Sequence, residues 1–229
     1  TNLQFGDNSG FSLGQPVTDQ NFVVTPLSSI MNADGSTDYD TFKTKLGLDS
    51  DYMIRFNDPF SNLGNASLNK AAVVNTQIAI MKSIISELGS VSESDVESTI
   101  ATQIITRTGD ETSLGDTTWT KNAITAISSS SDDFSPSSEQ LVSLSAGISA
   151  FMQKINANDS SKSHSHFAKA GMTELKDLMK KVMEGTADSA EIDKLTFNTI
   201  AWINENTSWD GGTITDNESE LVTTTYKLT

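Results

Sequence analysis

Residues 66–88 read ASLNKAAVVNTQIAIMKSIISEL, and this stretch decides the fold. Its apolar residues recur at helical spacing, at Leu68, Ala71, Val74, Ile78, Met81, Ile85 and Leu88. Because this spacing places the apolar residues on one side of a helix, the stretch predicts a helix with a single buried stripe. Gly89 follows directly and predicts the end of that helix, since glycine favours the turn that terminates helices.

The same signals predict two shorter helices on the N-terminal side of this stretch. The first begins at Pro26, with Thr25 as the N-cap and the proline at a position whose missing N–H costs nothing. The second is capped by Thr37, continues through Lys45 and stops at Gly47 in the C′ position.

Further helices are predicted on the C-terminal side. Ser92 or Ser94 opens the next one, with Glu97 three residues after Ser94 as the partner in a capping box. Periodic apolar residues then predict helices over residues 120–127, 135–156, 167–182 and 188–203. Their boundaries are marked by Ser135-Pro136, by Gly185 and by a capping box of Asp188 and Glu191.

These elements predict a mainly α-helical fold, a single multi-helix bundle with short β-strands at the N- and C-terminal ends. Residues 1–21 are predicted to be an extended N-terminal segment and residues 22–206 the helical domain. Residues 207–229 are predicted to be a turn and a C-terminal strand that packs on the same domain, because residues 221–228 are rich in β-branched side chains. Pairing of the two end strands would hold the chain ends together. The serine run at residues 128–131 is interpreted as a loop within the bundle, since apolar stripes continue on both sides.

Composition excludes several classes of function. The chain of 229 residues has no cysteine, which excludes disulfides, thiolate metal sites and a cysteine nucleophile. A formal net charge of −15 and only two arginines argue against nucleic acid as a partner. No apolar run approaches the roughly 20 residues that span a membrane, so membrane insertion is not expected. The sequence begins at Thr1 rather than Met, which suggests a piece of something longer.

The polar composition suggests a location. Serine and threonine, 32 and 27 residues, make up about a quarter of the chain, whereas charged residues make up 20%. An acidic, hydroxyl-rich, cysteine-free composition is common in secreted bacterial surface proteins, and it keeps a protein hydrated in salty surroundings. We therefore expect an extracellular or cell-surface location, with an ordinary acidic cytosolic protein as the alternative.

A calcium site is the first candidate for chemistry. Gly212, Ile214 and Glu218 fit positions 6, 8 and 12 of an EF-hand loop. The acidic positions at the start of such a loop are instead occupied by Thr207, Trp209 and Gly211. Asp210, Asp216 and Glu218 are the candidate metal ligands, and a plain turn is the alternative. The acidic stretch at residues 32–40 is explained by a loop with helix-capping residues.

His164 and His166 are the only histidines. On an extended segment two such residues point the same way and favour metal binding, with Asp159 or a partner chain as a further ligand. We favour a solvated loop for both.

No catalytic motif is recognisable. The sequence lacks a G-x-S-x-G elbow, a phosphate-binding glycine loop, an H-E-x-x-H pair and a dinucleotide fingerprint. Adjacent acids such as Asp132 and Asp133 lie in polar loops, where nothing would raise a pKa for general acid work. We therefore predict that the chain is not an enzyme. Four methionines with Phe151 and Phe167 are expected to be core residues rather than a groove for a partner helix: Met152, Met172, Met179 and Met183.

Several short phrases resemble helical modules of very large secreted or cell-surface, adhesin-like bacterial proteins. They are FVVTPLSSI at residues 22–30, LGL at 46–48, NDP at 57–59 and TQI at 76–78. Such modules often open with a V-T-P-L-T-T-L-like phrase and continue with an LGL and DP phrase. The resemblance covers residues 22–88, and Ser28, Ser29 and Ile30 replace the usual threonines and leucine. It implies an address and a modular role, without catalytic residues.

These observations together predict a non-catalytic structural or adhesive module. It would act by contacts with other protein domains of the same or neighbouring chains, or with glycan. A calcium-binding module stabilised by Ca²⁺ is the first alternative, and a secreted hydrolase with an unrecognised acidic site is the second.

Overall fold

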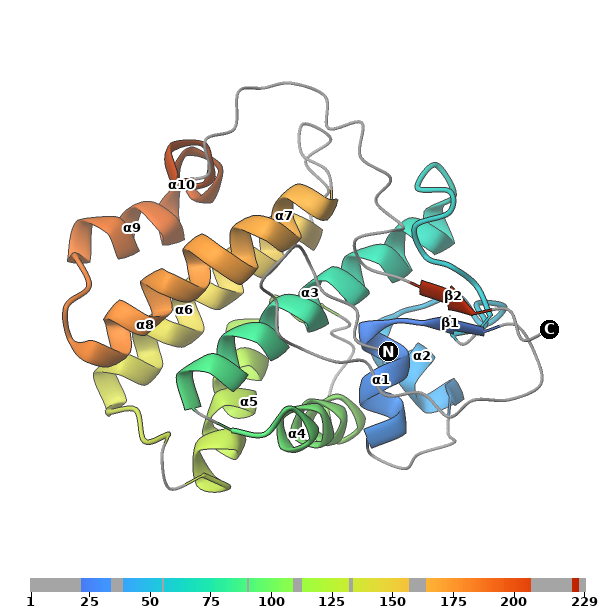
Figure 1. The fold of residues 1–229 in the computed structure, drawn as a ribbon, viewed down its shortest axis with the longest axis horizontal. Helices are drawn as coiled ribbons and strands as arrows, with labels where there is room; N and C mark the ends of the chain where they lie inside the picture. The colour runs from blue at the N-terminus through green and yellow to red at the C-terminus, as the bar shows by residue number, and fades with distance from the viewer. Residues whose placement is uncertain are drawn as a thin grey trace.

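The computed structural model describes residues 22–33, 39–54, 56–89, 91–108, 113–131, 134–156, 164–206 and 224–226. The protein is mainly helical in this part of the chain, as the sequence predicts (Figure 1). Its helices are α1 (Pro26–Ala33), α2 (Tyr39–Leu46), α3 (Ala66–Gly89), α4 (Glu93–Ile105), α5 (Thr117–Ser129), α6 (Ser138–Asn156), α7 (His164–Ala170), α8 (Lys176–Glu184), α9 (Ser189–Phe197) and α10 (Thr199–Asn206), with a π-helical turn, η2 (Gly171–Leu175), between α7 and α8. None of the described helices is long and apolar enough to cross a lipid bilayer.

Helix α3 is the central element, and it runs diagonally through the body in Figure 1. Every residue from 71 to 85 is buried, because α1, α4, α6, α7 and α8 all contact it. The prediction of one buried stripe is therefore wrong. Residues such as Val73, Ile80 and Ile84 lie off the predicted stripe and are buried as deeply as those on it.

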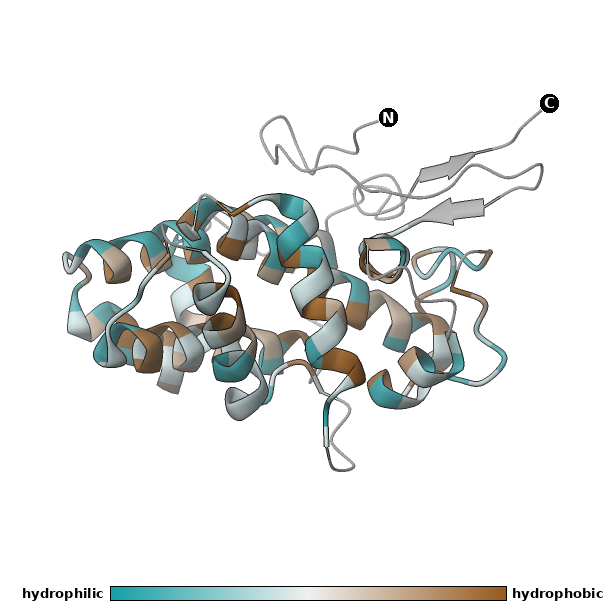
Figure 2. Cartoon of the chain, turned by 90° about the horizontal axis from the view of Figure 1, so that it is seen from below, coloured by the Kyte–Doolittle hydropathy of each residue, from teal (hydrophilic) through white to brown (hydrophobic). Residues whose placement is uncertain are grey.

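One cluster of buried apolar side chains extends from Leu27 in α1 to Ile203 in α10. It crosses the serine run, since α5 packs on α6 and α6 in turn packs on α8, α9 and α10. Apolar residues alternate with polar ones along the helices, as Figure 2 shows. The methionines and phenylalanines predicted as core do lie in this cluster or against it.

Several predicted helix boundaries are confirmed. Thr25 caps α1, since its Oγ1 accepts the Ser28 N–H at 3.1 Å while the Ser28 hydroxyl oxygen accepts the Thr25 N–H at 2.9 Å. Gly47 and Gly185 end α2 and α8 with φ of 61° and 70°, the left-handed conformation that glycine adopts without strain. The predicted cap at Thr37 lies outside the described residues.

Two predicted caps are displaced. Ser92 is the N-cap of α4 and accepts the Asp95 N–H, so the box of Ser94 with Glu97 is wrong; Glu97 points into the protein instead. Helix α6 begins at Ser138 rather than at Ser135-Pro136. Its box consists of Ser137 and Gln140: Ser137 Oγ accepts the Gln140 N–H at 3.3 Å, and Gln140 Oε1 accepts the Ser137 N–H at 2.8 Å.

The predicted helix at 167–182 is longer and contains a π-helical turn. It starts at His164 and continues through α7, η2 and α8 to Glu184. Gly171 opens the π turn against α3, where a Cβ would lie 2.7 Å from carbon atoms of Ile80. The predicted helix at 188–203 is instead two helices. They are separated by Asn198, whose φ of −145° and ψ of 64° are not helical.

Two three-residue segments lie near the ends of the described chain. They are β1 (Phe22–Val24) and β2 (Thr224–Tyr226), which run antiparallel with Val23 opposite Thr225. The extended segment predicted for residues 1–21, and all of 207–229 except β2, lie outside the described residues.

Candidate functional site

The described part of the chain offers four places where chemistry-bearing or exposed apolar side chains gather. They are a buried charge cluster between α1, α3 and α4, a histidine between α3 and α7, a depression on α8, α9 and α10, and a turn before α3. Each is built from residues whose neighbours position them differently from the sequence-based expectation.

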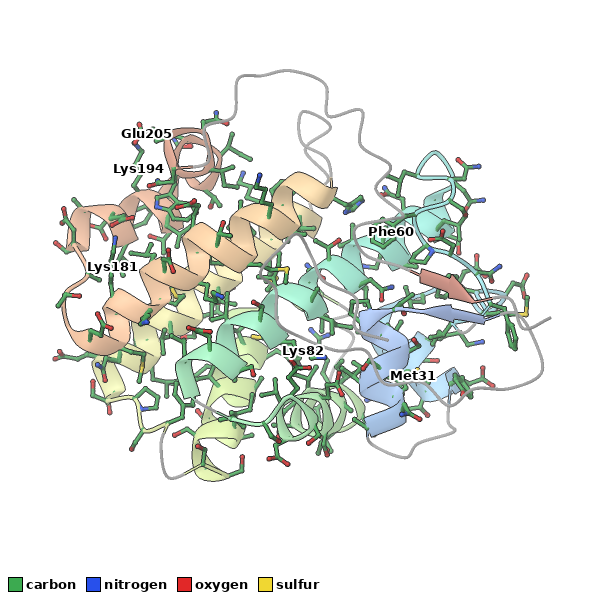
Figure 3. The ribbon with its side chains drawn as sticks, in the orientation of Figure 1. Met31, Phe60, Lys82, Lys181, Lys194 and Glu205 are labelled. Atoms are coloured by element: carbon green, nitrogen blue, oxygen red, sulfur yellow. The ribbon has the colours of Figure 1, made fainter. Side chains whose placement is uncertain are left out.

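The buried charge cluster is centred on Lys82, whose side chain is 0% exposed. Its Nζ forms an ion pair with Glu97 of α4 and lies 3.4 Å from Glu93 Oε2. The Ser29 hydroxyl of α1 donates to the same Glu97 oxygen. Figure 3 shows Lys82 at the side of α3 that faces α4 and α1. A buried charge needs such a partner, so the cluster joins three helices.

His164 lies in the first turn of α7 and is 6% exposed. Its Nε2 is 3.1 Å from Asn69 Oδ1, and its Nδ1 is 3.5 Å from Thr76 Oγ1, both on α3. The Phe60 ring meets it edge-on, with centroids 5.8 Å apart. Burial lowers the pKa of His164 to about 4, because the charged form loses its hydration. The predicted solvated loop is therefore wrong for His164.

The depression on α8, α9 and α10 is lined by four carboxylates, two lysines and one amide: Glu174, Asp177, Lys180, Lys181, Glu184, Glu191 and Asn206. Its volume of about 250 Å³ lies below the roughly 300–1,000 Å³ of typical small-molecule sites. Lys181 Nζ lies 4.0 Å from Glu191 Oε2, so part of this charge is neutralised on the spot. Burial, followed by the neighbouring Asp177, raises the pKa of Glu174.

The turn before α3 displays two large apolar side chains. Met53 and Phe56 are 55% and 47% exposed, whereas Tyr52 and Ile54 beside them are buried in the core. The turn is closed by hydrogen bonds: the Phe56 and Asn57 N–H groups both donate to the Met53 carbonyl at 2.9 Å. The Met53 N–H donates to Asn57 Oδ1 at 2.8 Å. The two exposed side chains are thus held on an ordered base.

The candidate calcium ligands Asp210, Asp216 and Glu218 lie outside the described residues, as do Asp132, Asp133 and Asp159. Among the described residues, no group of three or more His, Asp or Glu side chains could hold a metal ion. In the acidic stretch at 32–40, Asp40 is exposed in α2 and pairs with Lys43 at 2.8 Å. The side chain of His166 is not described.

Sequence reasoning missed Lys82 and the role of Glu97. The signal was present, because Lys82 interrupts the apolar run of α3 and has no apolar reason to be there. A single lysine in such a run predicts burial only if several helices cover the helix on all sides, and the one-stripe interpretation placed Lys82 outside.

Comparisons with known proteins bring no relative. A scan against protein-family models finds no match, and searches of curated proteins and of solved structures find no similar chain.

Proposed function

We propose that this chain is a non-catalytic structural or adhesive module of an extracellular or cell-surface bacterial protein. It acts through protein–protein or glycan contacts. The observation that carries the proposal is the turn with Met53 and Phe56, where two large apolar side chains face solvent on an anchored backbone. Ordered apolar groups of this kind favour contact with a partner surface.

The interior supports the same proposal. Buried polar side chains connect helices to one another: Asn75 Oδ1 of α3 accepts the Leu27 N–H of α1 at 2.9 Å, and Gln77 Nε2 donates to the Met152 carbonyl of α6 at 2.9 Å. Satisfied polar contacts between elements favour one rigid arrangement. A rigid body that presents an ordered apolar turn suits a structural or adhesive role.

The adhesive role is tested with beads that carry the protein. Binding of these beads to bacterial cells, to a glycan panel and to the immobilised chain itself is measured for the wild type and for Met53→Ser/Phe56→Ser. The matched control is Phe197→Ser, which removes an exposed aromatic side chain from α9. We expect the double variant to lose binding and the control to keep it. Equal binding by all three proteins would contradict the role of the turn.

The proposed location is tested on the producing bacterium. Antibody against the chain is expected to label intact cells or the culture medium, and external protease is expected to remove the labelling. Signal only after cell lysis would rule out the extracellular location.

The proposal includes short strands that hold the chain ends together, supported by the register that places Val23 opposite Thr225. Adjacent ends suit a module set into a longer chain. Because the chain has no cysteine, Val23→Cys/Thr225→Cys is expected to form a single disulfide, seen as a mobility shift that reductant abolishes. The control Val23→Cys/Thr224→Cys should stay reduced, since neighbouring strand residues point to opposite faces. Equal cross-linking of the two pairs would exclude the register.

A calcium-binding module is the first alternative, based on the pattern of Asp210, Asp216 and Glu218. A ligand that binds only the folded chain stabilises it by about 2.7 kcal/mol at a hundredfold excess over Kd. Melting is therefore compared in EDTA and in millimolar calcium, with sodium chloride at equal ionic strength as the control for screening. Asp210→Asn/Asp216→Asn/Glu218→Gln should abolish a specific shift. An unchanged melting temperature of the wild type would remove this alternative.

A secreted hydrolase is the second alternative, and Glu174 is its best described candidate. A carboxyl group with a raised pKa next to other carboxylates is typical of general acids. Chromogenic glycosides and peptides are the probes, and Glu174→Gln is compared with Glu184→Gln from the same depression. Hydrolysis no faster than in buffer would remove this alternative.

A further inference from the structure

His164 occupies a socket that suits a neutral ring. The Nε2–H donates to Asn69 Oδ1, while the Thr76 hydroxyl already donates its proton to the Ala72 carbonyl at 2.9 Å. Nδ1 therefore faces an oxygen atom, and the third neighbour is the uncharged Phe60 ring. None of these three contacts supplies the negative charge that would balance an imidazolium.

The charged residues next to this socket are directed elsewhere. Asp58 of the turn before α3 accepts the Phe60 N–H at 2.9 Å. Lys70 follows Asn69 in α3, so its side chain leaves the helix about 100° around the axis. Burial, with Arg107 second, lowers the pKa of Lys70, and any influence of this cation would oppose a second positive charge.

Two helices begin at this place. Helix α3 starts at Ala66, one turn before Asn69, and the continuous helix 164–184 starts at His164 itself. Figure 1 shows the beginnings of α3 and α7 on the same side of the body. The N-terminal end of a helix carries partial positive charge, so both beginnings disfavour a proton on this ring.

We propose that His164 is an acid-sensitive latch, which holds the start of α7 on α3 while the ring is neutral and releases it when the ring is protonated. The Nε2 contact to Asn69 joins the first turns of the two helices, so its loss opens the end at which both begin. This inference does not depend on the proposed function.

Linkage gives the direction and the size of the effect. The pKa of the closed state is about 4, against an ordinary value of 6.5 once the ring meets water. The open state therefore binds the proton more tightly, and closure is complete above pH 6.5 and weakens as the pH falls towards 4. From pH 7, the closed-to-open ratio is expected to fall about twentyfold by pH 5 and about a hundredfold by pH 4.

Amide hydrogen exchange in residues 164–170, corrected for the intrinsic pH dependence, measures this opening. We expect the protection factors of the wild type to fall about twentyfold between pH 7 and pH 5. In His164→Gln, whose amide can replace the Nε2–H donor but cannot be protonated, they should stay constant. His166→Gln is the matched control and should behave like the wild type.

An NMR titration of the His164 ring in the otherwise unchanged His166→Gln protein provides a second measurement, independent of whether the His164→Gln variant folds. A ring that stays neutral well below pH 6 supports the latch. A pKa near 6.5, or the same loss of protection in His164→Gln as in the wild type, would overturn it.

Discussion

Lys82 shows how one residue can set the arrangement of several helices. Its ammonium lies between Glu97 and Glu93 without contact with water, and Ser29 completes the cluster from α1. Removal of one partner leaves a buried charge, and that loss is usually larger than the net gain from the intact pair. The cluster therefore specifies how α1, α3 and α4 pack more than it adds stability.

We expect Lys82→Met to lower the free energy of unfolding by about 3–5 kcal/mol, because Glu97 stays buried without its cation. Adding Glu97→Leu should restore most of the loss, since methionine and leucine fill a similar volume without a charge. Urea unfolding of the two variants and the wild type measures both values. If Lys82→Met alone is neutral, Glu97 does not depend on this lysine.

Gly171 is required by the distance between two helices. A Cβ at this position would lie 2.7 Å from Ile80, so we expect Gly171→Ala to lose about 1–3 kcal/mol through overpacking. Ile80→Ala should compensate, so that the two changes together cost less than their sum. Gly185→Ala is the matched control: with φ of 70° and open space around it, it should lose only about 1 kcal/mol, from backbone strain. Chemical denaturation checks the set, and strict additivity of the first pair would contradict the close contact.

At the scale of elements, the sequence predicts helix identity better than helix boundaries. The apolar period places every described helix, because burial of one face is the same physics in each. Caps are harder, since serines stand at several adjacent positions, and only the packing of the helix decides which one turns back to it. The break at Asn198 and the π turn at Gly171 depend on contacts with other helices, which no local pattern contains.

The capping box of α6 is tested with two neighbouring serines. Ser137→Ala removes the oxygen that accepts the Gln140 N–H and should cost about 1 kcal/mol. Ser135→Ala, the position favoured by sequence, should change stability by less than about 0.5 kcal/mol, because that side chain is exposed. Thermal melting separates the two, and the reverse order would return the cap to Ser135.

At the scale of the whole molecule, the sequence predicts the helical class but not the candidate sites. The all-round burial of α3 follows from how many helices surround it, a property of the assembly that also explains Lys82. His164 is buried because α7 begins one turn earlier than its apolar stripe indicates, against a helix far away in the sequence. Both are long-range contacts, and a single sequence without relatives does not encode them in a readable form.

Continuity of the core across the serine run is the last prediction. Trp119 of α5 and Trp202 of α10 are both buried, on opposite sides of that run. Two variants isolate these probes: Trp202→Phe/Trp209→Phe keeps Trp119, and Trp119→Phe/Trp209→Phe keeps Trp202. Because one apolar cluster joins both regions, we expect each fluorescence curve in urea to have the same midpoint as the circular dichroism curve of the same variant. Two separate cores would instead unfold one after the other, so that each tryptophan would report a different midpoint from the helical signal.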